Sequence, residues 1–412
     1  MALALQLARR QLPVTLVEAR PGLSGGFRGE ALMPSGLEAL AHLDLLPLAG
    51  TVPQLPLRGW SFWLEGRPLF QVEEPMGSRH PCTLVEPGAL LHSWAEELRQ
   101  LPGARLLLGR AVAGLIHTDD GLSQGRIEGV RLSDGERLQA DVVVACDGRA
   151  SLLRRSAGLE LTDTSPTVDV LWFRLGGPTG EALAAQLAGR FHTVIGNDGS
   201  MALFASASGG VQLGWPLQGG ERIERSTEQW RELWRRLCPD GLSEALAFVP
   251  PEAIEGPLRL PVRVGLAHRW WRPGLLLLGD AAHPMSPLRA QGTAMALRDV
   301  VAATDLLPAA LEQPAGQGRD GALDRALAAM ETLRRPEIER MQALQQQEWQ
   351  RAERLGHRPA LRRLLAALAP GLAPLLAAVW QHSQGPLRQG LAGALHPAPP
   401  QAAMMERASA AR

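Results

Sequence analysis

Three short apolar runs, each closed by an acidic or a glycine residue, predict strands of one α/β sheet. They occupy residues 14–18 (VTLVE), 141–148 (DVVVACDG) and 275–280 (LLLLGD). The second and third runs do not alternate between apolar and polar positions, which is typical of strands buried on both faces. Helical patterns over 2–10, 34–45 and 87–100 accompany these runs, so we predict a sheet with helices packed on it.

The pattern changes between residues 166 and 260. Strand-like segments at 168–175, 191–195, 201–205 and 211–215 are joined by glycine-rich loops, with one helical segment near 228–237. This predicts an antiparallel sheet inserted into the α/β part. We divide the chain as follows: first part of the α/β domain at 1–165, with some strands of the inserted domain at about 55–80; inserted sheet at 166–260; second part of the α/β domain at 261–320; C-terminal helices at 321–396; flexible tail at 397–412.

Composition narrows the class of protein. Lysine and arginine together number 42, as do aspartate and glutamate, so charge gives no reason to expect a nucleic-acid partner. Cys82, Cys146 and Cys238 form no CxxC motif, and no zinc-type ligand spacing occurs, so we expect free thiols, no metal and a cytoplasmic location. The apolar start precedes its arginines, which is the wrong order for a signal peptide. The longest uncharged run, 364–380, contains two prolines and a glycine, so we expect no spanning helix.

The first strand ends in Glu18, and Arg28 follows a glycine-rich turn. In dinucleotide-binding folds an acid at this strand end binds the adenosine ribose, and a GxGxxG turn lies about 20 residues before it. Met1 is too close to Glu18 for that turn to be present. Without the first strand, buried backbone groups of its neighbours would stay unpaired at about 1–3 kcal/mol each. We therefore expect Met1 to be an internal methionine, and translation of the upstream frame to reveal a strand and GxGxxG.

The stretch 279–287 (GDAAHPMSP) carries a stronger signal than Glu18, which by itself also fits an ordinary solvated acid. A buried strand here delivers Asp280 into a crevice, and a helix opens afterwards at Gln291-Gly292. The carboxylate suits a polyol hydroxyl. The free N–H groups at Gly292–Ala294 form a positive helix end suited to a delocalised anion, such as a reduced flavin ring. The alternative is an ordinary strand, loop and helix.

Together these residues resemble the motifs of the class A FAD-dependent flavoprotein monooxygenases, the group of para-hydroxybenzoate hydroxylase and the ubiquinone-biosynthesis hydroxylases. The likeness rests on Glu18 with Arg28, on Asp147-Gly148-Arg149 and on 279–287, and it covers residues 1 to about 345. It implies a Rossmann-like FAD-binding domain that lacks its first strand, an inserted antiparallel-sheet substrate domain and a C-terminal helical region. It also implies FAD, NADPH or NADH as reductant, and O2-dependent hydroxylation of an aromatic or isoprenoid-like small molecule.

The resemblance also assigns cofactor contacts, although no residue is assigned as an acid or a base. By this likeness the groups of FAD would be held as follows: adenosine ribose by Glu18, pyrophosphate side by Arg28, adenine by Val112, pyrophosphate and NAD(P)H by Asp147 and Gly148, ribityl chain by Gly279 and Asp280, reactive flavin edge by Pro287, and pyrimidine end by Gly292, Thr293 and Ala294. Arg28 as a surface cation and Asp147 as a turn former remain alternatives.

Two further positions depart from the family pattern and would retune the flavin contacts. Gly88-Ala89 stand where an arginine is usual, and Ala294 stands where an asparagine is often found. The nearest alternative function is another FAD-dependent oxidoreductase or reductase on the same fold. The second alternative is that the chain is a truncated, non-catalytic remnant and serves as an interaction module. We expect weak FAD retention by the chain as it stands and tight binding once the upstream segment is present.

The sequence allows two interpretations for each of two further sets of side chains. Trp60, Phe62 and Trp172 fall in the presumed substrate layer, where they either line a pocket or pack in the core. The segment 361–380 combines Arg362 and Arg363 with many leucines and alanines, so it can lie on a membrane surface as a peripheral contact. The alternative is a pair of helices packed on the FAD-binding domain.

Overall fold

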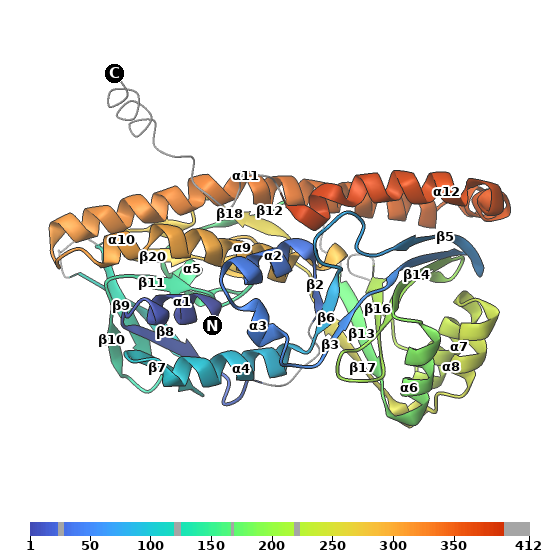
Figure 1. Cartoon of the computed structure of the whole chain (residues 1–412), viewed down its shortest axis with the longest axis horizontal. Coiled ribbons are helices and arrows are strands. Elements are labelled where there is room, and N and C mark those ends of the chain that lie inside the picture. The colour runs from blue at the N-terminus through green and yellow to red at the C-terminus, as the bar shows by residue number, and fades with distance from the viewer. Residues whose placement is uncertain (24–28, 119–124, 166–168, 218–222, 391–412) are drawn as a thin grey trace, which may run out of the picture.

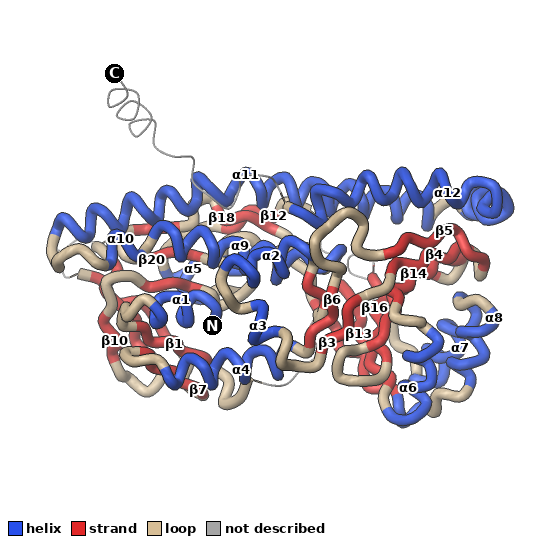
Figure 2. The backbone as a smooth tube through the Cα atoms, in the orientation of Figure 1, coloured by secondary structure: helices blue, strands red, loops and turns tan. Residues whose placement is uncertain are grey.

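The computed structural model describes residues 1–23, 29–118, 125–165, 169–217 and 223–390. Figure 1 shows two sheet-containing parts, with α11 (Gln317–Gly356) and α12 (Pro359–Gln389) running along one edge of both. Helices dominate the part that holds α1 and α9, whereas the longest strands gather beside α6, α7 and α8 (Figure 2). This architecture confirms the predicted α/β fold with an antiparallel sheet and a C-terminal helical region.

The three apolar runs form strands that pair in parallel. β1 (Val14–Glu18) pairs with β7 (Ala104–Leu108), and β11 (Val143–Ala145) pairs with β20 (Leu275–Leu277). β19 (Trp271–Arg272) joins β20 as an antiparallel neighbour. Among the described residues, β1 and β11 belong to separate sheets with no hydrogen bond between them.

Helices of the α/β part approach one another closely where small residues meet. A Cβ added at Gly36 would lie 3.2 Å from both Cα and Cβ of Ala294, so α2 and α9 nearly touch along their backbones. Ala294 is itself fully buried. Its side chain therefore serves helix packing, and a larger residue there would push α2 away. The helices of this part are α1 (Ala2–Arg9), α2 (Pro34–His42), α4 (Pro87–Gln100) and α9 (Gln291–Leu306).

Shorter elements connect these helices and strands. The small sheet β2–β6–β3 matters most for function, because its Val85 N–H donates to the Glu30 carbonyl at 2.9 Å and fixes the chain there. The shorter elements are β2 (Ala31–Leu32), α3 (Leu46–Ala49), β3 (Gln54–Pro56), β6 (Thr83–Val85), β8 (Val112–His117), β9 (Ile127–Leu132), β10 (Arg137–Gln139), α5 (Leu152–Ser156), β12 (Leu161–Asp163), β18 (Gly265–Ala267) and α10 (Pro308–Leu311).

A seven-stranded sheet forms the second part. Every neighbouring pair is antiparallel except β14 and β4, which run parallel. One face packs against three helices through Leu, Val and Trp side chains such as Trp215 and Trp234. In spatial order the strands are β17 (Ile254–Leu260), β13 (Asp169–Leu175), β16 (Val211–Leu217), β15 (Gly199–Ala205), β14 (Arg190–Gly196), β4 (Gly59–Leu64) and β5 (Arg67–Glu73).

The sequence predicted only one of the three helices on that face. α7 (Thr227–Leu237) matches the prediction near 228–237, but α6 (Gly177–Gln186) and α8 (Asp240–Ala247) were missed. α6 contains two glycines and a proline, which are typical of a loop. It is helical because Pro178 lies in its first turn, where the missing N–H costs nothing, and because Leu183 is buried against the sheet.

The two prolines of the run 364–380 lie inside α12 and do not end it. By length and composition, α12 is the one helix among the described residues that could cross a membrane, and only 11% of its most apolar window is buried. The prolines therefore do not interrupt the helix, and the expectation that this segment does not span a membrane stays a prediction.

Candidate active site

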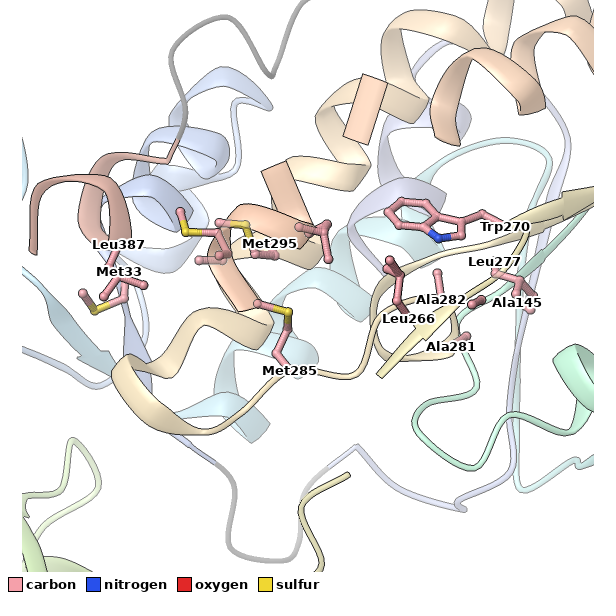
Figure 3. Packing of buried hydrophobic residues seen from close by; sticks show 14 of the residues in the cluster. Met33, Ala145, Leu266, Trp270, Leu277, Ala281, Ala282, Met285, Met295 and Leu387 are labelled. Atoms are coloured by element: carbon pink, nitrogen blue, oxygen red, sulfur yellow. The ribbon is translucent and has the colours of Figure 1, made fainter. Parts of the chain in front are cut away.

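The strand β20 delivers the Asp280 carboxylate to the edge of the α/β part. Leu275–Leu277 are fully buried, and the chain then turns at Gly279 with φ of +57°, which glycine adopts without strain. Ala281 and Ala282 pack beneath this turn, near Leu277 (Figure 3). The Asp280 side chain remains 33% exposed. A fixed carboxylate is thus available to a ligand at the end of a buried strand.

Arg149 brings two of the predicted motifs together. Its Nε donates to Asp280 Oδ2 at 3.0 Å, and its Nη2 donates to the Met285 carbonyl at 3.2 Å. The Asp147-Gly148-Arg149 stretch follows β11, which is the direct neighbour of β20. The two motifs are 130 residues apart in sequence but meet at one sheet edge. Sequence reasoning placed both motifs near the cofactor and missed the ion pair that joins them.

Asp147 and Gly148 also shape the turn that leads into α5. Asp147 Oδ2 accepts the Leu153 N–H at 3.0 Å, and the Gly148 carbonyl accepts the Ser151 N–H at 2.9 Å. Gly148 has φ of +80°, so a residue with a side chain would be strained there. Asp147 is therefore a turn former in this structure. Contact with the pyrophosphate stays a prediction.

Glu18 lies at the end of β1, where its Oε1 accepts the Arg20 N–H at 2.9 Å. Burial lowers the pKa of the amino-terminal group of Met1, while nearby Cys146 and Glu18 raise it. Glu18 ends β1 and Cys146 directly follows β11. Arg28 lies outside the described residues.

Val112 opens β8 and pairs in register with Leu132. Its side chain is half-buried. The adenine contact predicted for its backbone stays a prediction.

The helix α9 begins after two residues in the left-handed conformation, Arg289 with φ of +58° and Ala290 with φ of +48°. Non-glycine residues in this conformation store about 1–3 kcal/mol of strain and cluster at functional sites. Within the described residues no side chain caps the first turn of α9. Its first N–H groups, including those of Gly292–Ala294, therefore point outward without intrahelical acceptors. Pro287 and Thr293 are exposed beside this helix end.

A buried charge network fixes the turn from below. Asp299 accepts the Gly279 N–H at 3.2 Å, contacts His283 Nε2 at 2.6 Å and accepts Arg334 Nε at 2.8 Å. Arg334 also pairs with Glu337. Burial acts to raise the pKa of Asp299, but His283 and Arg334 together hold it below its usual range. His283 is 1% exposed, so the structure places it as a support of the loop.

A row of polar side chains on α11 holds the loop that leads to α9. Gln345 Nε2 donates to two carbonyls of loop 284–288, at 2.6 and 3.0 Å, and Gln342 Nε2 donates to a third at 3.3 Å. One turn further along, Glu348 Oε1 accepts Arg289 Nε at 2.8 Å. The three helix residues are spaced by three and therefore share a face. That spacing was the available signal in the sequence, and sequence reasoning did not use it.

Aromatic side chains cover the sheet face opposite α6–α8. Neighbouring ring centroids are 4.9 to 6.0 Å apart in the order Trp172, Phe204, Phe191, Trp60, Trp380 and Phe62. Trp380 comes from α12 and the others from the sheet. The guanidinium of Arg289 lies 4.9 Å from the Trp380 ring centroid and 5.4 Å from that of Trp60. This aromatic face thus reaches the residue that precedes α9 by two positions.

Glu30 is a buried carboxyl group that sequence reasoning missed. It is 5% exposed, and its oxygens accept Ser206 Oγ at 2.6 Å, the Ala207 N–H at 2.7 Å and the Gln212 side-chain amide. Burial is the largest effect on the pKa of Glu30 and raises it, although these donors and Arg174 act in the opposite direction. Among the described residues no ion pair neutralises it. A buried, perturbed carboxyl between two domains is a functional candidate.

We expect Glu30→Gln to change how stability depends on pH. Because the pKa of Glu30 is raised in the folded protein, its contribution is present at low pH and is lost as pH rises through that pKa. Glutamine does not titrate. The free energy of unfolding of the parent protein, relative to the variant, should therefore fall as pH rises above the usual glutamate value of 4.5. Urea unfolding of both proteins across this range measures the difference, and a constant difference would contradict the raised pKa.

The described residues fit FAD. Asp280 offers an acceptor to a polyol, and the uncapped start of α9 offers N–H donors to an anionic ring. Gly148 and Gly279 lie at the turns beside these donors and acceptors. Because neither carries a side chain, a ligand can approach the backbone there. Among the described residues, no group of three or more His, Cys, Asp or Glu side chains is placed to hold a metal.

Comparison with known proteins agrees with this geometry. The FAD binding domain family model matches residues 1–336. The 6-methylpretetramide 4-monooxygenase of Streptomyces rimosus is 33% identical over 358 residues, which span 84% of this chain and 80% of that protein. The ubiquinone hydroxylase of Rhodospirillum rubrum is 28% identical over 81% of this chain and 75% of its own length.

Solved structures share the fold at lower identity. The p-nitrophenol 4-monooxygenase of Pseudomonas putida matches with a TM-score of 0.74 at 18% identity, over 94% of this chain and 95% of that chain. PqsL of P. aeruginosa, in complex with 2-aminobenzoylacetate, matches with a TM-score of 0.69 at 21% identity, over 89% of this chain and 95% of that chain. Taken with the family match and the site geometry, the chain belongs to the class A FAD-dependent flavoprotein monooxygenases.

Proposed function

We propose that this monooxygenase hydroxylates an aromatic or isoprenoid-like small molecule that binds between the start of α9 and the aromatic face. The observation that carries the proposal is the continuous row of rings from Trp172 to Phe62, which reaches Arg289 beside α9. Aromatic rings bind planar apolar molecules through offset-stacked and edge contacts. Three relatives are named for 6-methylpretetramide, ubiquinone and squalene, which span both substrate classes.

FAD, when bound, supplies the redox chemistry between a reduced nicotinamide and O2. The protein contributes binding and orientation. Asp280 would hold the ribityl chain, and the N–H groups of Gly292–Ala294 would stabilise negative charge on the pyrimidine end of the ring. The loop 284–288 is held by Gln342 and Gln345, so the position of this helix start relative to Asp280 is fixed before a ligand arrives.

We further propose NADPH or NADH as the reductant and the cytoplasm as the location. The cysteines support a reducing compartment, because all three are free. Burial raises the pKa of the Cys82 and Cys238 thiols to about 12, so neither forms a reactive thiolate at neutral pH. Glu18 supports binding of an adenosine ribose through its place at the end of β1.

Turnover with labelled dioxygen tests the proposal. We expect the purified protein to bind added FAD and to show a flavin absorbance spectrum. NADPH or NADH oxidation should rise when a phenolic, quinone or polyene substrate is added. Mass spectrometry should find one labelled oxygen atom in the product. Substrate-dependent turnover that proceeds equally well without O2 would assign the protein to the reductase alternative.

A further inference from the structure

The outer face of α12 is an apolar surface that no described residue covers. Its leucines and valine are 37–61% exposed, and their spacing of three, four or seven residues places them on one side of the helix. They are Leu361, Leu364, Leu368, Leu375 and Val379, which are five of the eight large exposed apolar side chains among the described residues. A soluble protein rarely leaves so continuous a strip open without a binding partner.

The opposite face of α12 is occupied by protein contacts. Trp380 packs among the sheet aromatics, and Ala366 and Ala369 are buried. Arg362 Nε donates to Glu65 Oε1 at 2.6 Å, and Arg388 Nη1 donates to Glu74 Oε1 at 2.6 Å. Figure 1 shows α12 as the outermost layer beside β5. Because these contacts tie the helix to the sheet, α12 is placed to lie along a surface and not to cross a bilayer.

The charged residues of α12 and of the segment that leads into it are all basic. No acidic residue occurs from Arg354 to Gly390. The arginines on the inner face are neutralised by glutamates of the sheet, whereas Arg358 and Arg363 are exposed and form no ion pair within the described residues. An apolar strip with nearby unpaired cations complements acyl chains beneath anionic headgroups.

From these features we propose that the outer face of α12 docks on the surface of an anionic lipid bilayer. Leu361, Leu364, Leu368, Leu375 and Val379 enter the boundary between headgroups and acyl chains. The aliphatic parts of the Arg358 and Arg363 side chains lie beside the apolar boundary, and their guanidinium groups reach the lipid phosphates. The salt bridges of Arg362 and Arg388 hold the helix against the sheet, so the protein binds peripherally with its fold intact. A second copy of this chain lacks the acidic groups that would match these arginines along its own α12.

Co-sedimentation of the full chain with vesicles tests this proposal. Vesicles of equimolar phosphatidylcholine and phosphatidylglycerol should pellet the protein, and raised salt should weaken binding. Vesicles of phosphatidylcholine alone should bind it at least tenfold more weakly. The variant Leu364→Glu/Leu368→Glu/Leu375→Glu should lose at least ninety per cent of the binding while keeping the parent circular dichroism spectrum. The matched control is Phe248→Glu, which changes an even more exposed apolar residue directly after α8 and should bind as the parent does.

Specific results would overturn the proposal. One is a parent protein that stays in the supernatant with both kinds of vesicle. Another is a triple variant that binds as well as the parent does. The face would instead bind a second copy if light scattering finds the parent as a dimer, the triple variant as a monomer, and neither bound to vesicles. Binding that requires deletion of residues 391–412 would assign it to the chain's own tail. The parent and the deletion variant should bind anionic vesicles alike.

Discussion

Asp299→Ala is expected to lower the free energy of unfolding by about 3–5 kcal/mol, the usual cost of removing one partner from a buried ion pair. The substitution leaves Arg334 buried with one acid fewer and removes the acceptor of the Gly279 N–H. Both the charge network and the turn that carries Asp280 lose their support. Urea unfolding followed by circular dichroism measures the effect.

Two controls separate this effect from a general loss of helix stability. Glu312→Ala removes an exposed carboxylate just after α10 and should change stability by less than about 0.5 kcal/mol. Asp299→Asn keeps the shape and one acceptor, so it should fall between Asp299→Ala and the parent. A loss below about 1 kcal/mol for Asp299→Ala would contradict the assigned role of the network.

The same carboxylate should contribute to acid sensitivity. Because the pKa of Asp299 is lowered in the folded protein, its contribution is present above the usual value of 3.8 and is lost as pH falls through the lower folded pKa. The stability difference between the parent and Asp299→Asn should therefore shrink on acidification below about pH 4. Unfolding curves for the pair at successive pH values test this directly.

Asp280→Ala is expected to weaken FAD binding by about 10- to 150-fold, which corresponds to the loss of a hydrogen bond to a charged group worth about 1.5–3 kcal/mol. The carboxylate is partly exposed at the edge of the sheet and suits a ribityl hydroxyl. Quenching of flavin fluorescence in a titration gives the Kd. The comparison is a ratio of two Kd values measured under the same conditions, so it does not depend on how tightly the parent protein binds FAD.

Asp280→Ala also removes the ion-pair partner of Arg149. The variant Arg149→Gln is the control for this loss, and we expect it to change the Kd for FAD less because Asp280 remains. Asp163→Ala breaks a comparable ion pair with Arg263 on the surface at β12 and should leave FAD binding unchanged. An unaltered Kd in Asp280→Ala would remove this residue from the cofactor site.

Local sequence signals predicted the elements of the fold well where each element carries its own pattern. β20 and the turn at Gly279-Asp280 were predictable because an unbroken apolar run, a glycine and an acid follow one another. α6 was not, because its glycines and proline indicate a loop, whereas burial of Leu183 decides for a helix. Whether such a segment forms a helix or a loop depends on the residues that it packs against, and the sequence of the segment alone does not show them.

The site was predictable in its motifs and not in the contacts between them. Asp280 and the start of α9 could be located from 279–294 alone. The hydrogen-bond partners of Glu30 and Gln345 could not be located, because those partners lie more than fifty residues away in sequence. Arg149 illustrates both cases, since its motif was identified but its pairing with Asp280 depends on β11 and β20 being neighbours. Contacts between side chains of distant segments can be identified only from the tertiary structure.

The row formed by Gln342, Gln345 and Glu348 lies just beyond the part of the chain that the FAD binding domain model matches. The family match ends at residue 336, before any of the three. The Gln291 side chain, at the very start of α9, also donates to the carbonyl of Leu387 near the end of α12. A fragment that stops at residue 336 would keep the stretch 279–287 and yet leave loop 284–288 without the side chains that hold it. Such a fragment should therefore position the start of α9 less firmly than the full chain does.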